Sequence, residues 1–429
     1  MRPKASHAWN TLAIYSDKDN ALMLRRFCLY GFVKNQKYFE PFLYLALLDK
    51  LSFAGVGMLI GFRELCVIIM EIPSGAIADV LGRRRALIIS HACYIAAFVT
   101  FAWAYAAWLL FVAMFLFSIG EAFRTGTHKA MIFAWLANEG RSDEKTKIYG
   151  RTRSWSQLGS ALSIAIGATL VYATQRYDLV FLLSTVPYVI NIVNFVGYPK
   201  ELDGSGGAGV QPGQMLKTML RSVRKSLANR PLRRALAEAM TFNGLHKASK
   251  DWLGPLLRVV ALQLPLFMFL TDRRREAILV GAVYIVLYFL SSFASRHADL
   301  IVRRAGSVRR GSRWLWLANL ATFVLLGLGV LAGIGAVSIV AFIVLAMLRN
   351  FWRPIIVGRV AEYADDSQTA TILSIESQTK TLFTVVAAPL LGWTIGMMSP
   401  EMRFAPLAIL GVVITCLMLA TEPKDSEQG

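Results

Sequence analysis

A charged segment that occurs twice, between long apolar runs and about half a chain apart, constrains this protein more than any other feature. The first copy reads Gly75-Ala-Ile-Ala-Asp79-Val-Leu-Gly82-Arg83-Arg84-Arg85. The second copy reads Ser295-Arg-His-Ala-Asp299-Leu-Ile-Val302-Arg303-Arg304, and its aspartate and both arginines follow their counterparts by 220 residues. Repetition of a segment at a fixed separation predicts two halves of similar structure.

Two further matches support this repeat. The segment Gly31-Phe-Val-Lys34-Asn-Gln-Lys37 resembles Gly244-Leu-His-Lys247-Ala-Ser-Lys250, with a separation of 213 residues at the glycine and at both lysines. The pair Ser156-Gln157 returns as Ser377-Gln378, 221 residues later. Two halves with the same orientation in a membrane each need an even number of spans, and six spans suit the spacing of the charged loops.

The composition predicts a membrane protein. Of the 429 residues, 55% are hydrophobic and only 17% are charged, whereas soluble domains carry roughly 25% charged residues. Apolar runs such as 86–107, 278–293 and 315–348 are continuous rather than alternating, which favours helices over strands. A helical span needs about 20 mostly apolar residues. We therefore expect an all-α integral membrane protein with about twelve transmembrane helices in two six-helix, pseudo-symmetric halves.

Composition shifts suggest the domain boundaries. A segment rich in glycine follows residue 202 and is typical of a flexible linker. The segments that we expect are a cytoplasmic lead-in at 1–27, a six-helix bundle at 28–198, a cytoplasmic linker with a basic helix at 199–234, a second bundle at 235–420 and a cytoplasmic tail at 421–429.

The net charge of +19 reflects topology rather than a nucleic-acid partner, because the basic residues gather in alternate breaks between the apolar runs. Such residues collect in cytoplasmic loops, so we expect a membrane protein with both termini in the cytoplasm. The run Arg273-Arg274-Arg275 falls in a loop expected outside and is not explained by this rule. The four cysteines show no paired spacing, so neither a disulfide framework nor a metal site is expected.

The first charged segment resembles the signature of the loop between spans two and three in the major facilitator superfamily. Glu71-Ile-Pro-Ser-Gly75 and Gly120-Glu121-Ala-Phe-Arg124 are similar to a bacterial branch of that superfamily with unassigned substrates. The resemblance implies a secondary active transporter that works by alternating access, binds a small molecule as a monomer and needs no cofactor. It also implies a conformational latch, although the arginines could simply mark topology. The latch residues would be Gly75, Asp79, Gly82, Arg83 and Arg84, with Asp299, Arg303 and Arg304 from the second copy, whose loop should be less tightly folded because it lacks both glycines.

Charged residues inside predicted spans indicate a wet interior, since each costs about 2.5–3.5 kcal/mol on insertion scales. If the first span begins near Phe27, then Lys34, Lys37 and Glu40 fall on one helical arc of roughly 120°. The resemblance implies that spans 1, 4, 7 and 10 line a central cavity. Its candidate residues are Lys34, Lys37, Glu40, Arg124, Lys247, Lys250, Asp251, Arg349 and Arg353.

Cations outnumber acids in this set, which favours an anionic or zwitterionic small solute. Two alternatives stay open. Lysines near span ends can extend to the membrane surface, and pairs such as Lys37 with Glu40 or Glu121 with Arg124 could neutralise each other.

Proton coupling, if it occurs, needs a carboxylate that changes protonation. Glu64, Glu71 and Glu121 are the candidates. Arg63 beside Glu64 and Arg124 near Glu121 favour structural ion pairs for those two acids, because a nearby cation lowers a carboxyl pKa. Glu71 has no basic residue next to it in the sequence and is the preferred candidate.

Other functions remain as alternatives. A drug/proton antiporter is disfavoured because the fifth span, around 159–167, contains no proline and few glycines. An enzyme is disfavoured because the five histidines are scattered and no recognised catalytic motif is present. A transport-inactive membrane sensor or scaffold is the alternative from another class, since a fold does not fix a function.

Overall fold

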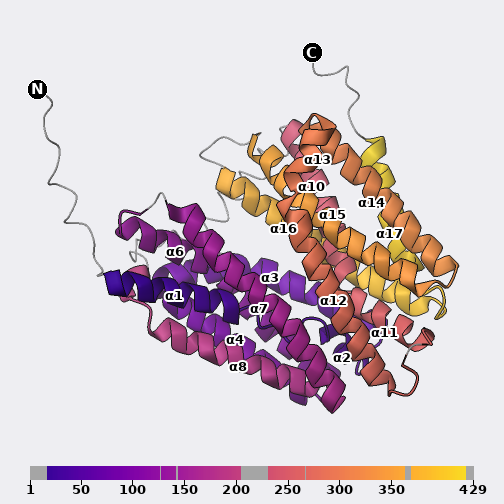
Figure 1. Cartoon of the computed structure of the whole chain (residues 1–429), viewed down its shortest axis with the longest axis horizontal. Coiled ribbons are helices and arrows are strands. Elements are labelled where there is room, and N and C mark those ends of the chain that lie inside the picture. The colour runs from indigo at the N-terminus through magenta and orange to yellow at the C-terminus, as the bar shows by residue number, and fades with distance from the viewer. Residues whose placement is uncertain are drawn as a thin grey trace, which may run out of the picture. The chain divides into compact units, whose positions relative to one another are not determined.

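The computed structural model describes residues 17–125, 127–141, 144–203, 230–265, 267–362 and 369–421. Within these ranges all regular structure is helical (Figure 1). The chain divides into two compact units. Unit 1 comprises Met1–Phe39, Ile69–Ile166 and Asp178–Pro212, and unit 2 comprises Glu40–Ile68, Gly167–Tyr177 and Gly213–Gly429. Each unit is described by itself.

The helices up to the linker account for the first six expected spans. Their bounds are α1 Asp17–Val33, α2 Leu43–Leu48, α3 Phe53–Leu81, α4 Arg83–Trp103, α5 Ala107–Arg124, α6 Thr127–Asn138, α7 Lys145–Thr174 and α8 Asp178–Val196, followed by the short 3-10 helix η2 Lys200–Asp203.

The helices after the linker account for the second six. Their bounds are α10 Arg230–Lys250, α11 Leu253–Gln263, α12 Asp272–Arg296, α13 Ala298–Ala305, α14 Val308–Leu331, α15 Gly335–Glu362, α16 Thr369–Met397 and α17 Ala405–Ala420.

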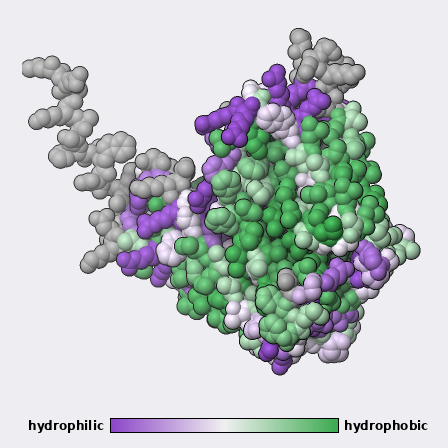
Figure 2. All heavy atoms as spheres, turned by 45° about the vertical axis from the view of Figure 1, so that its right-hand side comes forward, coloured by the Kyte–Doolittle hydropathy of each residue, from purple (hydrophilic) through white to green (hydrophobic). Residues whose placement is uncertain are grey.

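Most of these helices have the length and composition of membrane spans. Over the described residues, nine helical segments are long and apolar enough to cross a membrane. The other three expected spans correspond to α1 with α2, to α10 with α11, and to α17. Figure 2 shows a broad hydrophobic surface with hydrophilic residues gathered along two opposite edges. Continuous exposed apolar surface of this kind marks contact with lipid, and helices satisfy their own backbone groups there.

The first and seventh spans are interrupted at corresponding positions of the sequence repeat. Helix α1 ends at Val33 and α2 begins at Leu43, while α10 ends at Lys250 and α11 begins at Leu253. The expectation that Lys34, Lys37 and Glu40 share one helical arc is therefore wrong, because residues 34–42 are not helical. Discontinuous spans are common where transporters bind substrates or ions.

A local hydrogen bond explains the end of α1. The side-chain amide of Asn35 donates to the carbonyl of Gly31 at 2.8 Å, and an asparagine that bonds to nearby backbone competes with helix continuation. The backbone N–H of Gln36 then donates to Val33 at 3.0 Å, which tightens the last turn. The lysines at 34 and 37 belong to unit 1, whereas Glu40 belongs to unit 2. There the Tyr288 hydroxyl lies 3.4 Å from its carboxylate.

Close backbone contact brings α1 and α7 together in unit 1. A Cβ added at Gly31 would lie 2.6 Å from the carbonyl oxygen of Thr152, and one added at Gly159 would lie 2.2 Å from that of Phe32. Small residues at such positions allow membrane helices to pack closely. In unit 2, stacked aromatic rings bring α10 and α15 together: the ring centroids of Phe242 and Trp352 lie 4.3 Å apart.

Candidate functional site

Unit 2 contains a buried cluster of charges that joins α3 to α10. The guanidinium of Arg63 lies 2.6 Å from Glu64 and 3.0 Å from Asp251. Lys247 donates a hydrogen bond to the other carboxylate oxygen of Glu64. The side chains of Glu64 and Asp251 are only 3% and 5% exposed. We call these four residues the unit 2 ion cluster; two cations balance two acids within it.

Further polar groups complete this cluster. Arg63 donates to the hydroxyl of Tyr44, and Lys247 donates to the Thr381 hydroxyl at 3.1 Å. The ammonium of Lys250 is 3.9 Å from Asp251. Buried charges are tolerated when they are paired and hydrogen bonded. The sequence-based expectation that Glu64 pairs with Arg63 is confirmed, and the geometry adds Lys247 as a second cation on the same carboxylate.

Unit 1 contains a second polar group, half-buried and centred on α5. Arg124 lies 2.5 Å from the Glu121 carboxylate, which also accepts a hydrogen bond from the Tyr94 hydroxyl at 2.6 Å. The Nε of Arg124 donates to the same tyrosine oxygen at 3.3 Å. The pair expected between Glu121 and Arg124 is therefore present. Sequence reasoning did not identify Tyr94, because a tyrosine in an apolar run carries no charge that would distinguish it.

Lys34 lies beside this group. Its ammonium sits 5.2 Å from the centroid of the Tyr30 ring, and that ring stacks on His128 with centroids 3.8 Å apart. An ammonium held over an aromatic face is stabilised by the ring quadrupole. The charges that act on Lys34 within unit 1 are Arg124, Lys37, Arg153 and Glu121. With Lys34 itself, this makes four cations against one acid, and we call these five residues the unit 1 cation cluster.

The corresponding region of unit 2 includes α15 and α16. Arg349 lies within electrostatic range of Arg353 and of Glu376. Glu376 is buried and accepts a hydrogen bond from the Asn243 amide at 3.0 Å. Sequence reasoning missed both Glu376 and Asn243, although an acid at the start of the apolar segment 375–397 was a signal that could have been used.

The first charged segment folds against η2, the short helix that follows α8. Gly82 separates α3 from α4 with a φ of +93°, and a Cβ there would lie 2.8 Å from the side chain of Asp203. The carboxylate of Asp203 accepts a hydrogen bond from the backbone N–H of Arg84 at 2.7 Å. Asp203 thus satisfies a free N–H at the first turn of α4, where the helix dipole favours an anion. Sequence reasoning did not identify this residue.

The other residues expected in the latch differ in their settings. Gly75 lies within α3, with open space where a Cβ would be. The second copy forms the short helix α13, in which Arg303 and Asp299 pair at 3.0 Å while remaining exposed to solvent. Arg304 lies in the last turn of α13 and Arg83 at the start of α4. The Asp79 side chain, the basic linker helix expected before residue 230 and the lead-in before residue 17 lie outside the described residues.

Partners in unit 2 account for the basic run at the start of α12. Arg273 pairs with Asp49 at 2.9 Å and lies 4.2 Å above the Tyr177 ring. Arg258 pairs with the same aspartate at 3.0 Å and with Glu276 at 3.2 Å. Burial raises the pKa of the Tyr177 hydroxyl, and the carboxylate of Glu276 raises it further.

The remaining two arginines of the run bond to nearby backbone. Arg274 donates to the carbonyl of Tyr172 at 3.3 Å, and Arg275 donates to that of Leu264 at 2.5 Å. Arg275 also pairs with Asp272 at 3.4 Å. These contacts give the run Arg273–Arg275 a structural role that a count of loop charges could not reveal.

A family model described as Major Facilitator Superfamily matches residues 27–375. The chain belongs to this superfamily. Membership, together with the apolar helices, makes it a multi-pass membrane protein of a transporter family, and it confirms the resemblance read from the sequence. No curated protein sequence matches the chain at a significant level.

Several solved structures share this fold over nearly the full length of the chain. A mutant of the nucleoside transporter NupG has a TM-score of 0.75 at 12% identity, covering 93% of this chain and 98% of its own. A POT family transporter in complex with 5-aminolevulinic acid has a TM-score of 0.69 at 15% identity, covering 95% and 97%. A D-xylose-proton symporter has a TM-score of 0.64 at 13% identity, covering 96% and 99%. At these identities the likeness establishes the fold alone.

Proposed function

We propose that this superfamily member is a secondary active transporter that moves a small anionic or zwitterionic solute by alternating access. The observation that carries the proposal is the unit 1 cation cluster: the charges that act on Lys34 are three cations and one acid, and that acid is already paired with Arg124. An anion is the ligand that best offsets such an excess at low dielectric. Arginine offers a forked set of donors for a carboxylate or phosphate, and lysine offers a compact charge.

The unit 2 ion cluster favours a structural role for its residues rather than contact with the solute. Its two cations and two acids neutralise one another, so it supplies no spare charge to a solute. Within unit 2, the candidates for solute contact are Lys250, Arg349 and Arg353, because the first is 44% exposed and Arg349 approaches Arg353 and Glu376. We assign Lys34, Lys37 and Arg124 as the primary contacts to the anionic group.

The solved relatives are compatible with this chemistry but do not select it. The POT family structure holds 5-aminolevulinic acid, a zwitterion, and another POT structure is in complex with sulfate. The nucleoside and xylose transporters handle solutes without a fixed charge. A panel that spans these classes is therefore the appropriate first screen.

Uptake into proteoliposomes tests the proposal. The panel should contain labelled carboxylates, phosphates, amino acids, nucleosides, sugars and lipophilic cations. We expect uptake of an anionic or zwitterionic compound. Replacing Lys34→Gln should raise KM for it by about tenfold or more, because a hydrogen bond to a charged group contributes about 1.5–3 kcal/mol. Lys129→Gln is the matched control, since Lys129 also sits over a ring, Phe133, at 5.4 Å but on the exposed face of α6.

The same assay separates the alternatives. Uptake or efflux of lipophilic cations alone would support a drug/proton antiporter and would contradict the anion proposal. A transport-inactive sensor or scaffold would be favoured by two results together. No compound of the panel would show flux, and cells that carry Lys34→Gln would keep the phenotype of wild-type cells. We also propose that both termini lie on the cytoplasmic side of a bacterial inner membrane, on the basis of the basic loops, and reporter fusions at each end would test this.

A further inference from the structure

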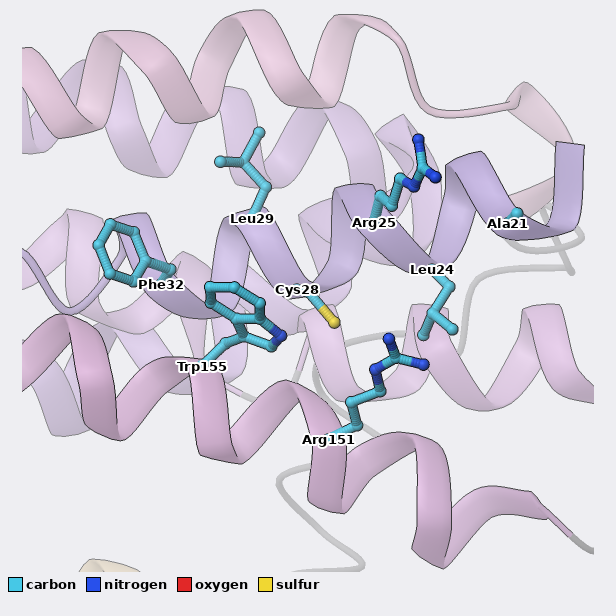
Figure 3. Close-up of a pocket in the computed structure, with 8 residues that line it drawn as sticks. All are labelled: Ala21, Leu24, Arg25, Cys28, Leu29, Phe32, Arg151 and Trp155. Atoms are coloured by element: carbon cyan, nitrogen blue, oxygen red, sulfur yellow. The ribbon is translucent and has the colours of Figure 1, made fainter. Parts of the chain in front are cut away.

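Unit 1 carries a groove between α1 and α7 that the proposed transport function does not use. Its volume is about 460 Å³, and its apolar wall includes Leu24, Leu29, Phe32 and Trp155 (Figure 3). The ring of Phe32 meets that of Trp155 edge to face, 6.2 Å between centroids. The close contact at Gly31 and Gly159 holds the two helices together beside the groove.

Both arginines line the part of the groove nearest Leu24, and the Arg25 side chain points away from α7, on the other side of α1 from Arg151 (Figure 3). On α1, Arg25 precedes Phe32 by about two turns, and on α7, Arg151 precedes Trp155 by one turn (Figure 3). The Arg151 side chain points toward α1 and the thiol of Cys28 (Figure 3). Among the described side chains, neither guanidinium forms an ion pair with an acidic residue. The groove therefore carries two cations near Leu24, whereas its lining toward Phe32 and Trp155 is apolar.

The surroundings of the groove are apolar and exposed. Leu29 and Trp155 are each 43% exposed, and Leu158, one turn further along α7, is 59% exposed. In a membrane-spanning chain, such side chains contact lipid. The apolar span that contains Arg151 begins at Ile148, so this arginine lies in the first turn of the span, at the depth where basic side chains reach headgroups.

We propose that this groove binds an anionic phospholipid, with an acyl chain along the apolar wall, the phosphate beside Arg151, and Arg25 adding positive charge near the headgroup. Guanidinium groups bind phosphate through paired, charge-assisted hydrogen bonds. Basic pockets between transmembrane helices recognise acidic headgroups, and each nearby cation contributes about 1 kcal/mol. A headgroup with its own ammonium offsets that attraction, which gives the groove a preference for net negative lipids. The inference is independent of which solute the protein transports.

Native mass spectrometry of the full chain tests the site. The protein is equilibrated in mixed micelles with equal phosphatidylglycerol and phosphatidylcholine. We expect the wild type to retain phosphatidylglycerol preferentially, and Arg25→Gln with Arg151→Gln to reduce that preference by about tenfold to thirtyfold. Arg85→Gln with Arg296→Gln is the matched control, because both are exposed arginines at helix ends outside the groove and their removal lowers the net charge equally.

A second measurement reports on the apolar lining of the groove. Phosphatidylglycerol with brominated acyl chains should quench tryptophan fluorescence more than brominated phosphatidylcholine, and Trp155→Phe should remove this difference. Equal retention of the two lipids by the wild type would overturn the proposal, as would equal losses in the groove and control variants. Stabilisation by inorganic phosphate alone, to the same extent as by phosphatidylglycerol, would also overturn it, because the apolar wall would then have no role.

Discussion

The guanidinium of Arg63 lies 3.0 Å from the carboxylate of Asp251, although the two residues are 188 positions apart in the chain. The contact joins α3 to the residue that follows α10 inside unit 2, and Lys247 joins α10 itself to α3 through Glu64. Any conformational change that separates α3 from α10 must break these ion pairs. Because these ion pairs are buried, a single substitution should destabilise the conformation in which they are intact.

We expect Asp251→Asn to destabilise the protein by about 3–5 kcal/mol, because removing one of the two acids leaves Arg63 and Lys247 to share the single carboxylate of Glu64 in a buried site. Thermal or denaturant unfolding in detergent would measure this loss. The double variant Arg63→Met with Asp251→Asn should recover part of it, since both charges of the pair are then absent. Asp299→Asn is the control: its pair with Arg303 is exposed, so the effect should stay within about 1 kcal/mol. Equal effects at 251 and 299 would contradict the buried cluster.

Gly159→Ala should destabilise unit 1 by about 1–3 kcal/mol through overpacking. The new methyl group would lie 2.2 Å from the carbonyl oxygen of Phe32, so α1 and α7 must move apart. Gly150→Ala, on the same helix, is the matched control, because nothing lies within 4 Å of its added Cβ. Melting temperatures of the two variants in one detergent would decide the question, and similar values would show that α1 and α7 do not pack closely at Gly159.

The two glycines of the first charged segment should respond differently to alanine. Gly82→Ala should cost about 1–3 kcal/mol, because Gly82 has a φ of +93° and its Cβ would meet Asp203. Gly75→Ala should be neutral or slightly stabilising, since it lies inside α3 with open space around it and alanine favours helix. Unfolding measurements test stability. A transport assay then shows whether the Gly82 turn also affects turnover, as a latch would require.

Glu71→Gln should abolish accumulation driven by a pH gradient while leaving solute exchange at equal pH intact, if Glu71 carries the coupled proton. An amide keeps the shape of the side chain but cannot bind and release a proton. Glu71 lies half buried within α3. Glu401→Gln is the control, because Glu401 is exposed and lies outside the apolar segments. Gradient-driven uptake by Glu71→Gln at the wild-type level would exclude this residue from coupling.

The repeat found in the sequence places Lys34 and Lys247 at equivalent positions, yet their surroundings differ. Lys34 sits over the ring of Tyr30, whereas Lys247 is paired with Glu64. The residue equivalent to Tyr30 is Asn243, which instead bonds to Glu376. The two halves therefore share a backbone plan, including the interrupted spans, but not the chemistry of their polar side chains.

The sequence by itself determined the helical class, the number of spans, the repeat and the pairs Arg63–Glu64 and Glu121–Arg124. These depend on apolar length and on neighbours within one helical turn, which are local properties of the chain. Only the tertiary structure decided that Arg63 meets Asp251, that Asp203 caps α4 and that Arg273 lies over Tyr177. Those contacts join segments far apart in sequence, and their distances depend on how the helices pack, which no local pattern specifies.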